Sequence, residues 1–363
     1  MTEAFVDLSR INANYTLLSK RYDAYCVVKS DAYGHGLLPV ARSLYSVGAR
    51  RFAVVEGRDA LTLLSHLKSL ETLLLQAPPD ALLPALIARG AVFSLSELSF
   101  AKRLSAVAAS LHKRVRCHVA LNSGMNRLGL SLSPSDAQET MRAVRHILCM
   151  PQLSVEGVYS HLAASAADAY TAMQTQRFFA ALSEIGAMRA EMRVRAPLVF
   201  HLSATANLSR AALFPSGVVP RVRVGLALYG YGTSGVQPAM ALFADVLGRF
   251  FLRRGESVGY GMEYTAPYDM QTAVVGIGYA DGLPRLHGGI AFYHEDALLP
   301  VLGRVSMNHT VVALPRDVAL QRGDRVTVFR PDGASLLALS AATDRIPYEL
   351  LLMGSRAYRI YKK

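Results

Sequence analysis

Short apolar runs alternate with longer segments of helical periodicity from about residue 24 to residue 229. An uninterrupted apolar run of this kind predicts a strand that is buried on both faces, and apolar positions every three or four residues predict a helix. Alternation of strand and helix repeated eight times is typical of a closed parallel barrel. The expected strands lie near residues 24–28, 51–55, 72–75, 91–93, 115–121, 154–159, 198–200 and 221–224.

Helix-start signals stand between these runs. Ser94 with Glu97, and Ser133 with Pro134 and Asp136, offer side-chain oxygens that can cap free backbone N–H groups, and the proline presets the first turn. One apolar series with a helical repeat predicts a helix that faces the core. It consists of Phe178, Leu182, Ile185, Met188 and Met192.

The pattern changes after about residue 235. Helical periodicity fades, and short β-rich runs such as 272–275 and 310–313 alternate with Gly, Pro and Asp turns. The length of 363 residues fits a barrel of about 250 residues plus a smaller unit. We therefore predict an α/β chain in which a (β/α)8 barrel over residues 1–235 is followed by a smaller, mainly-β domain over residues 236–363.

Composition narrows the setting. Hydrophobic residues make up 52% of the chain, yet no apolar stretch approaches the roughly 18 residues that cross a bilayer. Residues 1–7 lack the layout of a signal peptide, so we expect a cytoplasmic protein with no membrane partner. Cys26, Cys117 and Cys149 fall in predicted buried elements without close spacing, which predicts small hydrophobes and neither a disulfide nor a metal site.

The formal net charge is +12, but Lys and Arg are scattered along the chain without a run of like charge or an aromatic platform. This distribution predicts a solvated basic surface and no nucleic-acid partner. Part of the charge can favour an anionic phosphate or carboxylate ligand.

Lys29 ends the apolar run 25–28 and opens the polar loop 30–36. The carboxyl end of a parallel strand is where chemistry is placed in such folds. A partly desolvated lysine there is neutral near pH 7 and can form a Schiff base with a carbonyl compound. From position alone, a lysine that extends into solvent at a strand end is the commoner case.

The following residues favour the reactive lysine. Residues 27–36 read Val-Val-Lys-Ser-Asp-Ala-Tyr-Gly-His-Gly. This stretch closely resembles the signature of alanine racemases, in which the lysine carries pyridoxal 5'-phosphate. Further motifs of that family occur in family order over essentially the whole chain. The resemblance implies a (β/α)8 barrel with a smaller β domain, and a homodimer with shared active sites.

The resemblance also implies a phosphate site. Residues 223–230 resemble the family's glycine turn before a short helix, with Val224 in place of proline, and the N–H groups of Gly225 and Leu226 would face an anion. Thr205 matches a phosphate-binding serine. The phenols of Tyr33 and Tyr348 would reach the same phosphate. A glycine turn without these neighbours is more often structural.

Arg223 matches the family arginine that faces the pyridine nitrogen. A guanidinium stays protonated and has no acceptor, so the nitrogen beside it stays unprotonated and the ring withdraws electrons less strongly. This favours racemisation over transamination. His161 matches the histidine that packs against the ring. Outside these motifs, Arg223 in a surface salt bridge and His161 as a structural residue are the ordinary interpretations.

Racemisation needs one group on each face of the substrate Cα, because one group removes a proton and the other delivers one. By resemblance these groups are Lys29 and Tyr264, and the matching tyrosine reaches the other subunit's site, so an obligate dimer is implied. A phenol with a pKa near 10 is a poor base, so neighbouring cations would have to lower its pKa. The ordinary role of such a tyrosine is packing.

Residues 278–285 and 301–308 resemble family segments around the substrate entrance. The backbone N–H of Met307 would bind the substrate carboxylate. By the same resemblance, the approach is lined by Tyr279, Arg285 and Arg304.

The chain departs from the family pattern in residues 118–129. Ala120 stands where many relatives carry a lysine, often carbamylated, and Asn122 stands where they carry an aspartate. These supports orient the arginine equivalent to Arg127, which contacts the cofactor and the substrate carboxylate. We expect Arg127 to keep this role, held as a buried guanidinium by an anion such as chloride. Two further changes remove a charge or a polar group: Asn308 replaces an aspartate of the family pattern, and Ala204 replaces an asparagine.

The resemblance thus implies an alanine racemase that interconverts L- and D-alanine and supplies D-alanine for peptidoglycan. A racemase for serine or for a broader set of amino acids is the near alternative. A barrel protein that binds the cofactor without catalysis is the non-enzyme alternative, and it would normally lack Tyr264. A related decarboxylase would normally use a cysteine of its β domain, whereas all three cysteines here precede residue 150.

Overall fold

The computed structural model describes residues 2–163, 168–208 and 219–363. The chain forms two compact units, each discontinuous in sequence. The barrel unit comprises residues 15–29 and 44–228, and the β unit comprises residues 1–14, 30–43 and 229–363. The domain boundary at residue 235 stays a prediction.

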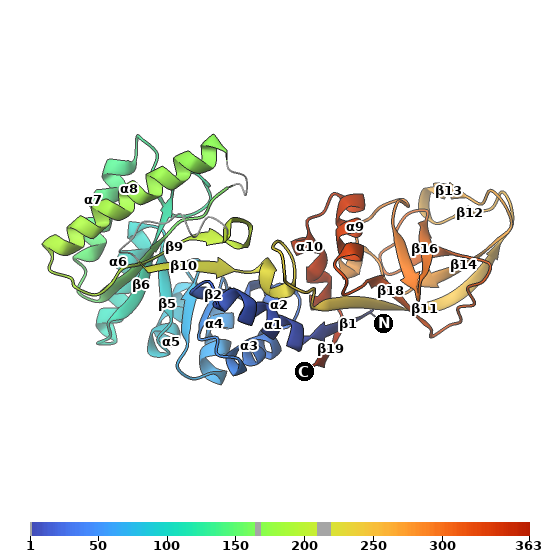
Figure 1. Ribbon diagram of the computed structural model, residues 1–363, viewed down its shortest axis with the longest axis horizontal. Helices are drawn as coiled ribbons and strands as arrows, with labels where there is room; N and C mark the ends of the chain where they lie inside the picture. Colours follow the sequence, from blue (N-terminus) through green and yellow to red (C-terminus); the bar gives the residue numbers. More distant parts are fainter. Residues whose placement is uncertain (1, 164–167, 209–218) are drawn as a thin grey trace. The chain divides into compact units, whose positions relative to one another are not determined.

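The barrel unit is a ring of eight parallel strands (Figure 1). Neighbours along the chain pair with one another, β10 pairs with β2, and the pairing of β5 with β6 completes the ring. Each predicted strand overlaps an observed one, so the predicted barrel is confirmed. The strands are β2 (Ala24–Val27), β3 (Arg51–Val54), β4 (Glu71–Leu74), β5 (Val92–Leu95), β6 (Val115–Asn122), β8 (Leu153–Tyr159), β9 (Val199–Ala204) and β10 (Val219–Val224), and the short β7 (Leu130–Ser131) pairs with β6.

Helices lie outside the barrel strands, as α7 and α8 show most clearly in Figure 1. In α8 the residues Phe178, Leu182, Ile185 and Met188 are buried, which confirms the predicted core-facing helix, and Met192 ends it. The helices are α4 (Gly57–His66), η1 (Asp80–Leu82), α5 (Leu83–Ala88), α6 (Leu98–Ser110), α7 (Ala137–Leu148), α8 (Ala169–Glu191) and η3 (Leu226–Tyr229).

The two predicted serine caps are wrong. Ser94 lies inside β5, where its hydroxyl oxygen accepts a hydrogen bond from the Tyr159 hydroxyl at 2.8 Å, and α6 begins only after Glu97. Ser133 stabilises the start of α7 through its backbone carbonyl, which accepts from the N–H of Ala137 at 2.9 Å. Tertiary hydrogen bonding in one case and backbone geometry in the other replace the side-chain cap.

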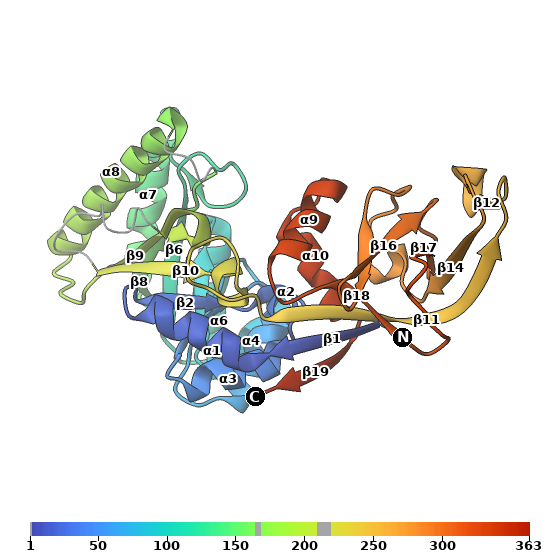
Figure 2. The same ribbon diagram turned by 45° about the vertical axis from the view of Figure 1, so that its right-hand side comes forward.

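The β unit is mainly β, as predicted. Its strands follow the order β14-β17-β16-β15-β18-β11-β1-β19, and β14 also pairs with β11. Figure 2 shows β1 between β11 and β19. β1 is antiparallel to β11 and parallel to β19, so the N-terminal strand is part of the β unit. The strands are β1 (Thr2–Asp7), β11 (Met240–Leu252), β14 (Met270–Val275), β15 (Ala291–His294), β16 (Ala297–Leu302), β17 (Thr310–Leu314), β18 (Arg325–Phe329) and β19 (Tyr358–Lys362).

Shorter elements complete the described chain. The sequence did not predict the helices near its end, α9 (Ala334–Thr343), α10 (Pro347–Leu351) and η6 (Leu352–Ser355). The remaining elements are α1 (Leu8–Ser19), α2 (Lys29–Tyr33), α3 (Leu37–Ser46), β12 (Ser257–Val258), η4 (Tyr260–Met262), β13 (Tyr264–Thr265) and η5 (Tyr279–Asp281).

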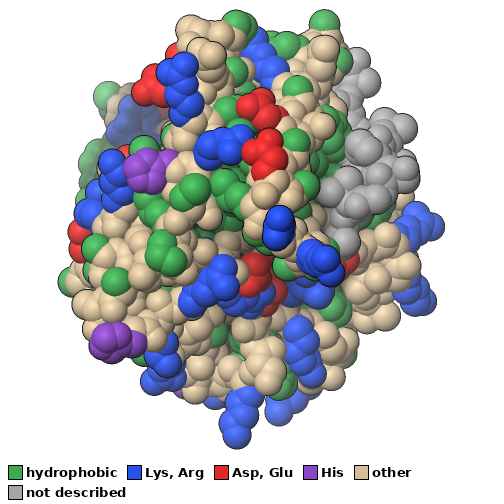
Figure 3. Space-filling model, turned by 90° about the vertical axis from the view of Figure 1, so that its left-hand side faces the viewer, with side chains coloured by type: hydrophobic (Ala, Val, Ile, Leu, Met, Phe, Trp, Pro, Cys, Tyr) green, Lys and Arg blue, Asp and Glu red, His purple; other side chains and the backbone are tan. Residues whose placement is uncertain are grey.

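Lys and Arg side chains are spread over the face that Figure 3 shows, with Asp and Glu among them. Among the helices that the structure describes, none is long and apolar enough to span a membrane. Cys26 and Cys117 are buried free thiols, but Cys149 is exposed, so its predicted burial is wrong. Cys149 follows the last residue of α7, where the helix end meets solvent.

Candidate active site

Lys29 begins α2, separated by one residue from the end of β2, and is half-buried. Burial lowers the pKa of its amine, and the positive charges of Arg127 and Arg223 lower it further. All three effects disfavour the protonated form. The direction of this pKa shift agrees with the expected reactive amine, and the role of Lys29 stays a prediction.

The loop after Lys29 has an unusual backbone. Ser30, Asp31, Ala32 and Tyr33 all have φ between 53° and 54°, which is a left-handed turn. Such a conformation costs roughly 1–2 kcal/mol for each L-residue, because Cβ approaches the following carbonyl oxygen. Four consecutive left-handed residues therefore require contacts from outside the loop that hold the backbone in this conformation.

Arg223 of β10 is only 5% exposed. Its guanidinium donates to the carbonyl oxygens of His201 at 2.6 Å and Ser160 at 2.8 Å. No carboxylate pairs with it among the residues that the structure describes, which excludes the surface salt bridge. Burial, with a smaller effect of Arg127, lowers the pKa of Arg223 to about 10. It remains a cation at neutral pH.

Arg223 also starts a chain of hydrogen bonds inside the barrel. Its Nη1 lies 2.7 Å from Nδ1 of His201, and Nε2 of His201 lies 2.8 Å from Nδ1 of His118. Because a guanidinium can only donate, Nδ1 of His201 accepts and its Nε2–H donates to His118. Burial lowers the pKa of His118 to about 3, and burial with the charge of Arg223 lowers that of His201 far below 6.5. Both rings are therefore neutral.

The sequence analysis assigned no role to these two histidines. Both histidines occur within segments that resemble family motifs, and they lie at interior positions of β6 and β9. Their contact depends on the barrel register, so no local signal joins them. His161, which was predicted, comes shortly after β8 and its Nδ1 accepts from Arg223 at 3.1 Å. Burial and the charge of Arg223 lower the pKa of His161 to about 3, so it is neutral too.

The predicted phosphate-binding groups of the barrel unit lie together. Oγ1 of Thr205 accepts from the N–H of Gly225 and from the N–H of Ala227, both at 3.3 Å. The hydroxyl hydrogen of Thr205 thus remains available to an anion. Within the described part of the chain the N–H of Leu226 has no acceptor, so it can bind a phosphate oxygen. The N–H of Gly225, which was also expected to face the phosphate, donates to Thr205.

Tyr33 and Tyr348 lie together in the β unit. The ring of Tyr33 stacks on Tyr229 with centroids 4.9 Å apart, and its centroid lies 5.7 Å from that of Tyr348. Burial raises the pKa of both phenols, and the proximity of Tyr348 raises that of Tyr33 further. Both phenols are therefore protonated and can donate to a phosphate oxygen.

Tyr264 begins β13 and is half-buried. Its hydroxyl lies 3.3 Å from Sδ of Met270. Burial raises its pKa, and Tyr268 adds to the rise. Among the residues that the structure describes, no cation contributes to this pKa shift, so the lowered pKa that a base would need is not provided within one chain.

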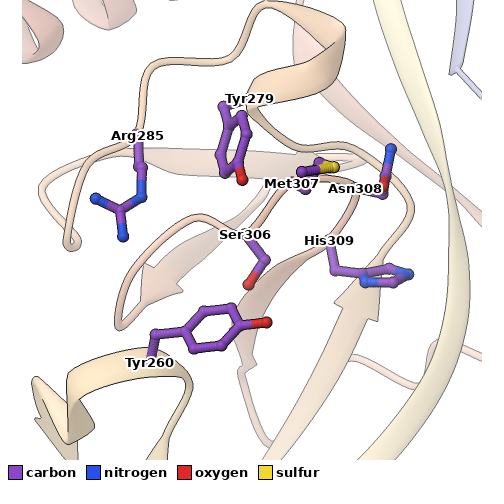
Figure 4. Close-up of a pocket in the computed structure, with 7 residues that line it drawn as sticks. All are labelled: Tyr260, Tyr279, Arg285, Ser306, Met307, Asn308 and His309. Carbon is purple, nitrogen blue, oxygen red and sulfur yellow. The ribbon is translucent and has the colours of Figure 1, made fainter.

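A pocket of about 470 Å³ surrounds the predicted carboxylate-binding segment. Figure 4 shows Tyr279 and Arg285 on one side and Tyr260 on the other, with Ser306 between them. The carbonyl oxygen of Met307 accepts from Ala280 at 2.9 Å. In the ranges that the structure covers, the N–H of Met307 has no acceptor, so it is free to bind a carboxylate. Arg304, expected near the approach, forms an ion pair with Glu263.

Arg127 lies in an exposed loop, so its predicted burial is wrong. The loop is held by Asn122, whose Oδ1 accepts from the N–H groups of Gly124 at 3.1 Å and Asn126 at 2.9 Å. Asn122 therefore supports the backbone and not Arg127. Because an exposed guanidinium is solvated, it needs no buried anion. Its charge still lowers the pKa of Lys29, and its role toward the substrate stays a prediction.

The comparisons with known proteins agree with this geometry. The family description "Alanine racemase, N-terminal domain" matches residues 6–233, and "Alanine racemase, C-terminal domain" matches residues 239–361. Alanine racemase of Symbiobacterium thermophilum is 31% identical over 98% of this chain and 95% of its own length, and that of Beutenbergia cavernae is 34% identical over 99% and 97%.

Solved structures show the same fold. An alanine racemase of Clostridium difficile has a TM-score of 0.87 at 25% identity and covers 99% of this chain and 95% of its own. The alanine racemase of Bartonella henselae with covalently bound pyridoxal phosphate has a TM-score of 0.85 at 26% identity and covers 99% of each chain. The chain described here belongs to the alanine racemase family.

Proposed function

We propose that this protein interconverts L- and D-alanine with pyridoxal 5'-phosphate, by a mechanism with one proton-transfer group on each face of Cα. The observation that carries the proposal is Arg223, a buried guanidinium without a carboxylate partner among the described residues. Its Nη hydrogen bonds go to carbonyl oxygens and to histidine nitrogens, so its positive charge is not neutralised and favours an anionic ligand nearby. Together with the amine of Lys29, it marks the site of an anionic carbonyl cofactor.

The residues present fit that cofactor. Thr205 and Leu226 offer a hydroxyl and a backbone N–H to a phosphate, Arg223 keeps its Nε–H for a ring nitrogen, and Lys29 offers an amine of lowered pKa to the carbonyl carbon. When it is bound, pyridoxal phosphate withdraws electrons from the substrate Cα and so makes its proton removable.

Arg223 determines the kind of reaction. His201 and His118 are neutral, and each already receives a hydrogen bond in the chain that begins at Arg223. The chain therefore offers no proton to the ring nitrogen, since the guanidinium does not give up its own near pH 7. Weak electron withdrawal favours rapid return of a proton to Cα, which is racemisation.

We further propose that Lys29 serves one face of Cα and that Tyr264 serves the other in the partner subunit. Three exposed side chains lie close to Tyr264 in sequence, Tyr260 at 70%, Met262 at 72% and Tyr268 at 62%. Exposed apolar groups in such number are typical of a surface that another chain covers. The cations of the partner's site would then lower the pKa of Tyr264. On this proposal residues 1–235 supply the lysine and residues 236–363 the tyrosine.

For substrate binding, we propose that the N–H of Met307 and the guanidinium of Arg127 hold the carboxylate. Alanine is the substrate that the family supports, and serine or a broader set of amino acids remains the alternative, because the altered surroundings of Arg127 change the pocket. The match of residues 239–361 to the C-terminal domain argues against the non-enzyme barrel. We also propose a cytoplasmic location and a role in peptidoglycan synthesis.

The test is to incubate the cofactor-loaded protein with single L- and D-amino acids and to separate the enantiomers by chiral chromatography. Conversion of alanine in both directions is expected, and no conversion in either direction refutes the assignment. Lys29→Ala should lose the visible absorption of the bound cofactor, whereas Tyr264→Phe should keep that absorption and lose racemisation. Tyr358→Phe, at an exposed tyrosine of β19, is the matched control and should leave both unchanged.

A further inference from the structure

The left-handed loop after Lys29 is held by the last strand of the chain. Nη1 of Arg359 in β19 forms an ion pair with Oδ2 of Asp31 and donates to the carbonyl oxygen of Gly34 at 3.3 Å. The other carboxylate oxygen of Asp31 accepts from the N–H of Leu37 at 2.7 Å, where α3 begins. Asp31 therefore joins the strained turn, the next helix and a distant strand.

Two alternate residues of β19 face this loop. Arg359 pairs in register with Ala4 of β1, and Tyr361 pairs with Val6. A Cβ on Gly36 would overlap the hydroxyl of Tyr361, so the strand and the loop are in close contact. Residues two apart in a strand point to the same side of it. Arg359 and Tyr361 therefore both contact the loop from one side of β19.

We propose that Arg359, acting through Asp31, is a positioning residue for Lys29 and Tyr33. The ion pair keeps residues 30–33 left-handed. Without it the loop relaxes toward ordinary backbone conformations and turns the amine and the phenol away from the cofactor. The inference rests on the proposed function, because it concerns how the same site is held in place.

The stack of Tyr33 on Tyr229 is the competing support for the loop. Its rings pack by dispersion and do not fix the backbone of Ser30 and Asp31. Arg359 holds the loop at two points, the side chain of Asp31 and the backbone carbonyl of Gly34. Two such contacts restrict both the position of Asp31 and the path of the backbone after it. The structure therefore assigns the larger share of this positioning to Arg359.

The test compares Arg359→Met with Lys362→Met. Lys362 lies on the same strand, and its exposed ammonium forms an ion pair with Asp7 at 3.5 Å. Its position alternates with those of Arg359 and Tyr361, so it points to the other side of β19. Two quantities are measured in each variant: cofactor affinity by titration of visible absorption, and amide hydrogen exchange of residues 29–37 in the cofactor-free protein. Arg359→Met should weaken cofactor binding by about tenfold or more, which corresponds to the loss of one hydrogen bond between charged groups. Exchange in the loop should become faster, while Lys362→Met leaves both quantities unchanged.

Further variants separate positioning from folding. Arg359→Lys should recover part of the affinity, because it keeps the charge and loses the bond to Gly34. The double variant Asp31→Asn with Arg359→Met should be no weaker than Arg359→Met alone, because the two residues act as one pair. Unchanged affinity and exchange in Arg359→Met overturn the proposal. The proposal is also overturned if Arg359→Met and Lys362→Met lower the melting temperature equally and weaken cofactor binding equally. The loss of affinity would then reflect general destabilisation.

The two proposals fail in different ways. If the parent protein does not racemise amino acids but Arg359→Met still loosens the loop and weakens cofactor binding, the proposed function is wrong and the positioning role stands. If the parent racemises alanine and Arg359→Met behaves like Lys362→Met, only the positioning role is wrong.

Discussion

Burial sets the protonation of the histidines around Arg223. His118, His161 and His201 lie in or just after barrel strands, and burial with neighbouring cations favours their neutral forms. Neutral rings can accept from the guanidinium, which charged rings cannot. The single positive charge of Arg223 thus stays available to a ligand. Burial of the three histidines also makes the stability of the fold sensitive to acid.

We predict that stability falls as the pH drops below about 6.5. The pKa of His118 and of His161 is about 3 in the folded protein, whereas an unfolded histidine has a pKa near 6.5. Between these values the unfolded chain binds protons that the folded chain does not, so the free energy of unfolding decreases as the pH falls. For His118 alone the loss from pH 7 to pH 5 is about 2 kcal/mol. Urea unfolding at pH 7, 6 and 5 measures it.

A carboxylate provides the internal comparison. Burial would raise the pKa of Glu71, but hydrogen bonds from Tyr25 and Arg116 and the charge of Arg221 hold it at about 2. Its contribution is therefore present at pH 7 and is lost only below about pH 4.5. A free energy of unfolding that is constant from pH 7 to pH 5 would contradict the neutral histidines.

Among the strands, the contact between β6 and β8 decides how His118 reaches His201. The pairing register shifts between Cys117 and His118, which is a local irregularity of the kind found beside functional sites. Gly157 of β8 lies opposite His118, and a Cβ there would lie 2.6–2.7 Å from the histidine ring. The imidazole thus occupies the space that a side chain at position 157 would need.

We predict that Gly157→Ala destabilises the barrel by roughly 1–3 kcal/mol, because the buried ring of His118 cannot move away. The same variant should reduce racemisation, since a displaced His118 no longer accepts from His201. Denaturant unfolding followed by circular dichroism measures the first effect. Gly186→Ala in α8 is the control: a Cβ there meets no atom within 4 Å, so this variant should be neutral or more stable by up to about 1 kcal/mol. Equal stability of the two variants would show that the space beside His118 is not restricted.

For the whole molecule, the division of chemistry between the units is the main feature. Lys29 and Arg223 belong to the barrel unit, whereas Tyr264 and Met307 belong to the β unit. Under the proposed dimer, each active site takes its lysine from one subunit and its tyrosine from the other. Activity should then depend on assembly.

We predict that two inactive variants restore each other. Lys29→Ala and Tyr264→Phe, unfolded together and refolded as a mixture, should form dimers of which about half are mixed, and each mixed dimer holds one complete site. The mixture should therefore recover about a quarter of the parent activity, measured by chiral chromatography. Each variant refolded alone is the control. Activity of the mixture no higher than that of the separate variants would mean that each chain completes its own site.

The sequence by itself determined the order of elements and the main chemistry. Apolar runs and helical periodicity report burial along one element at a time, so they predicted the eight barrel strands and the core side of α8. The roles predicted for Lys29, Arg223 and Thr205 came from the short motifs in which they occur. The serine caps at Ser94 and Ser133 were wrong because tertiary hydrogen bonds and backbone carbonyls took their place.

Only the tertiary structure decided which distant residues meet. His118 and His201 are 83 residues apart, and their contact depends on the register of the closed barrel. Arg359 reaches Asp31 because β19 pairs with β1, a contact across almost the whole chain. Arg127 proved exposed, because burial of a single side chain depends on the path of its loop and not on its motif. Local periodicity carries information about neighbours in sequence, whereas pairing between strands brings together side chains that no local pattern connects.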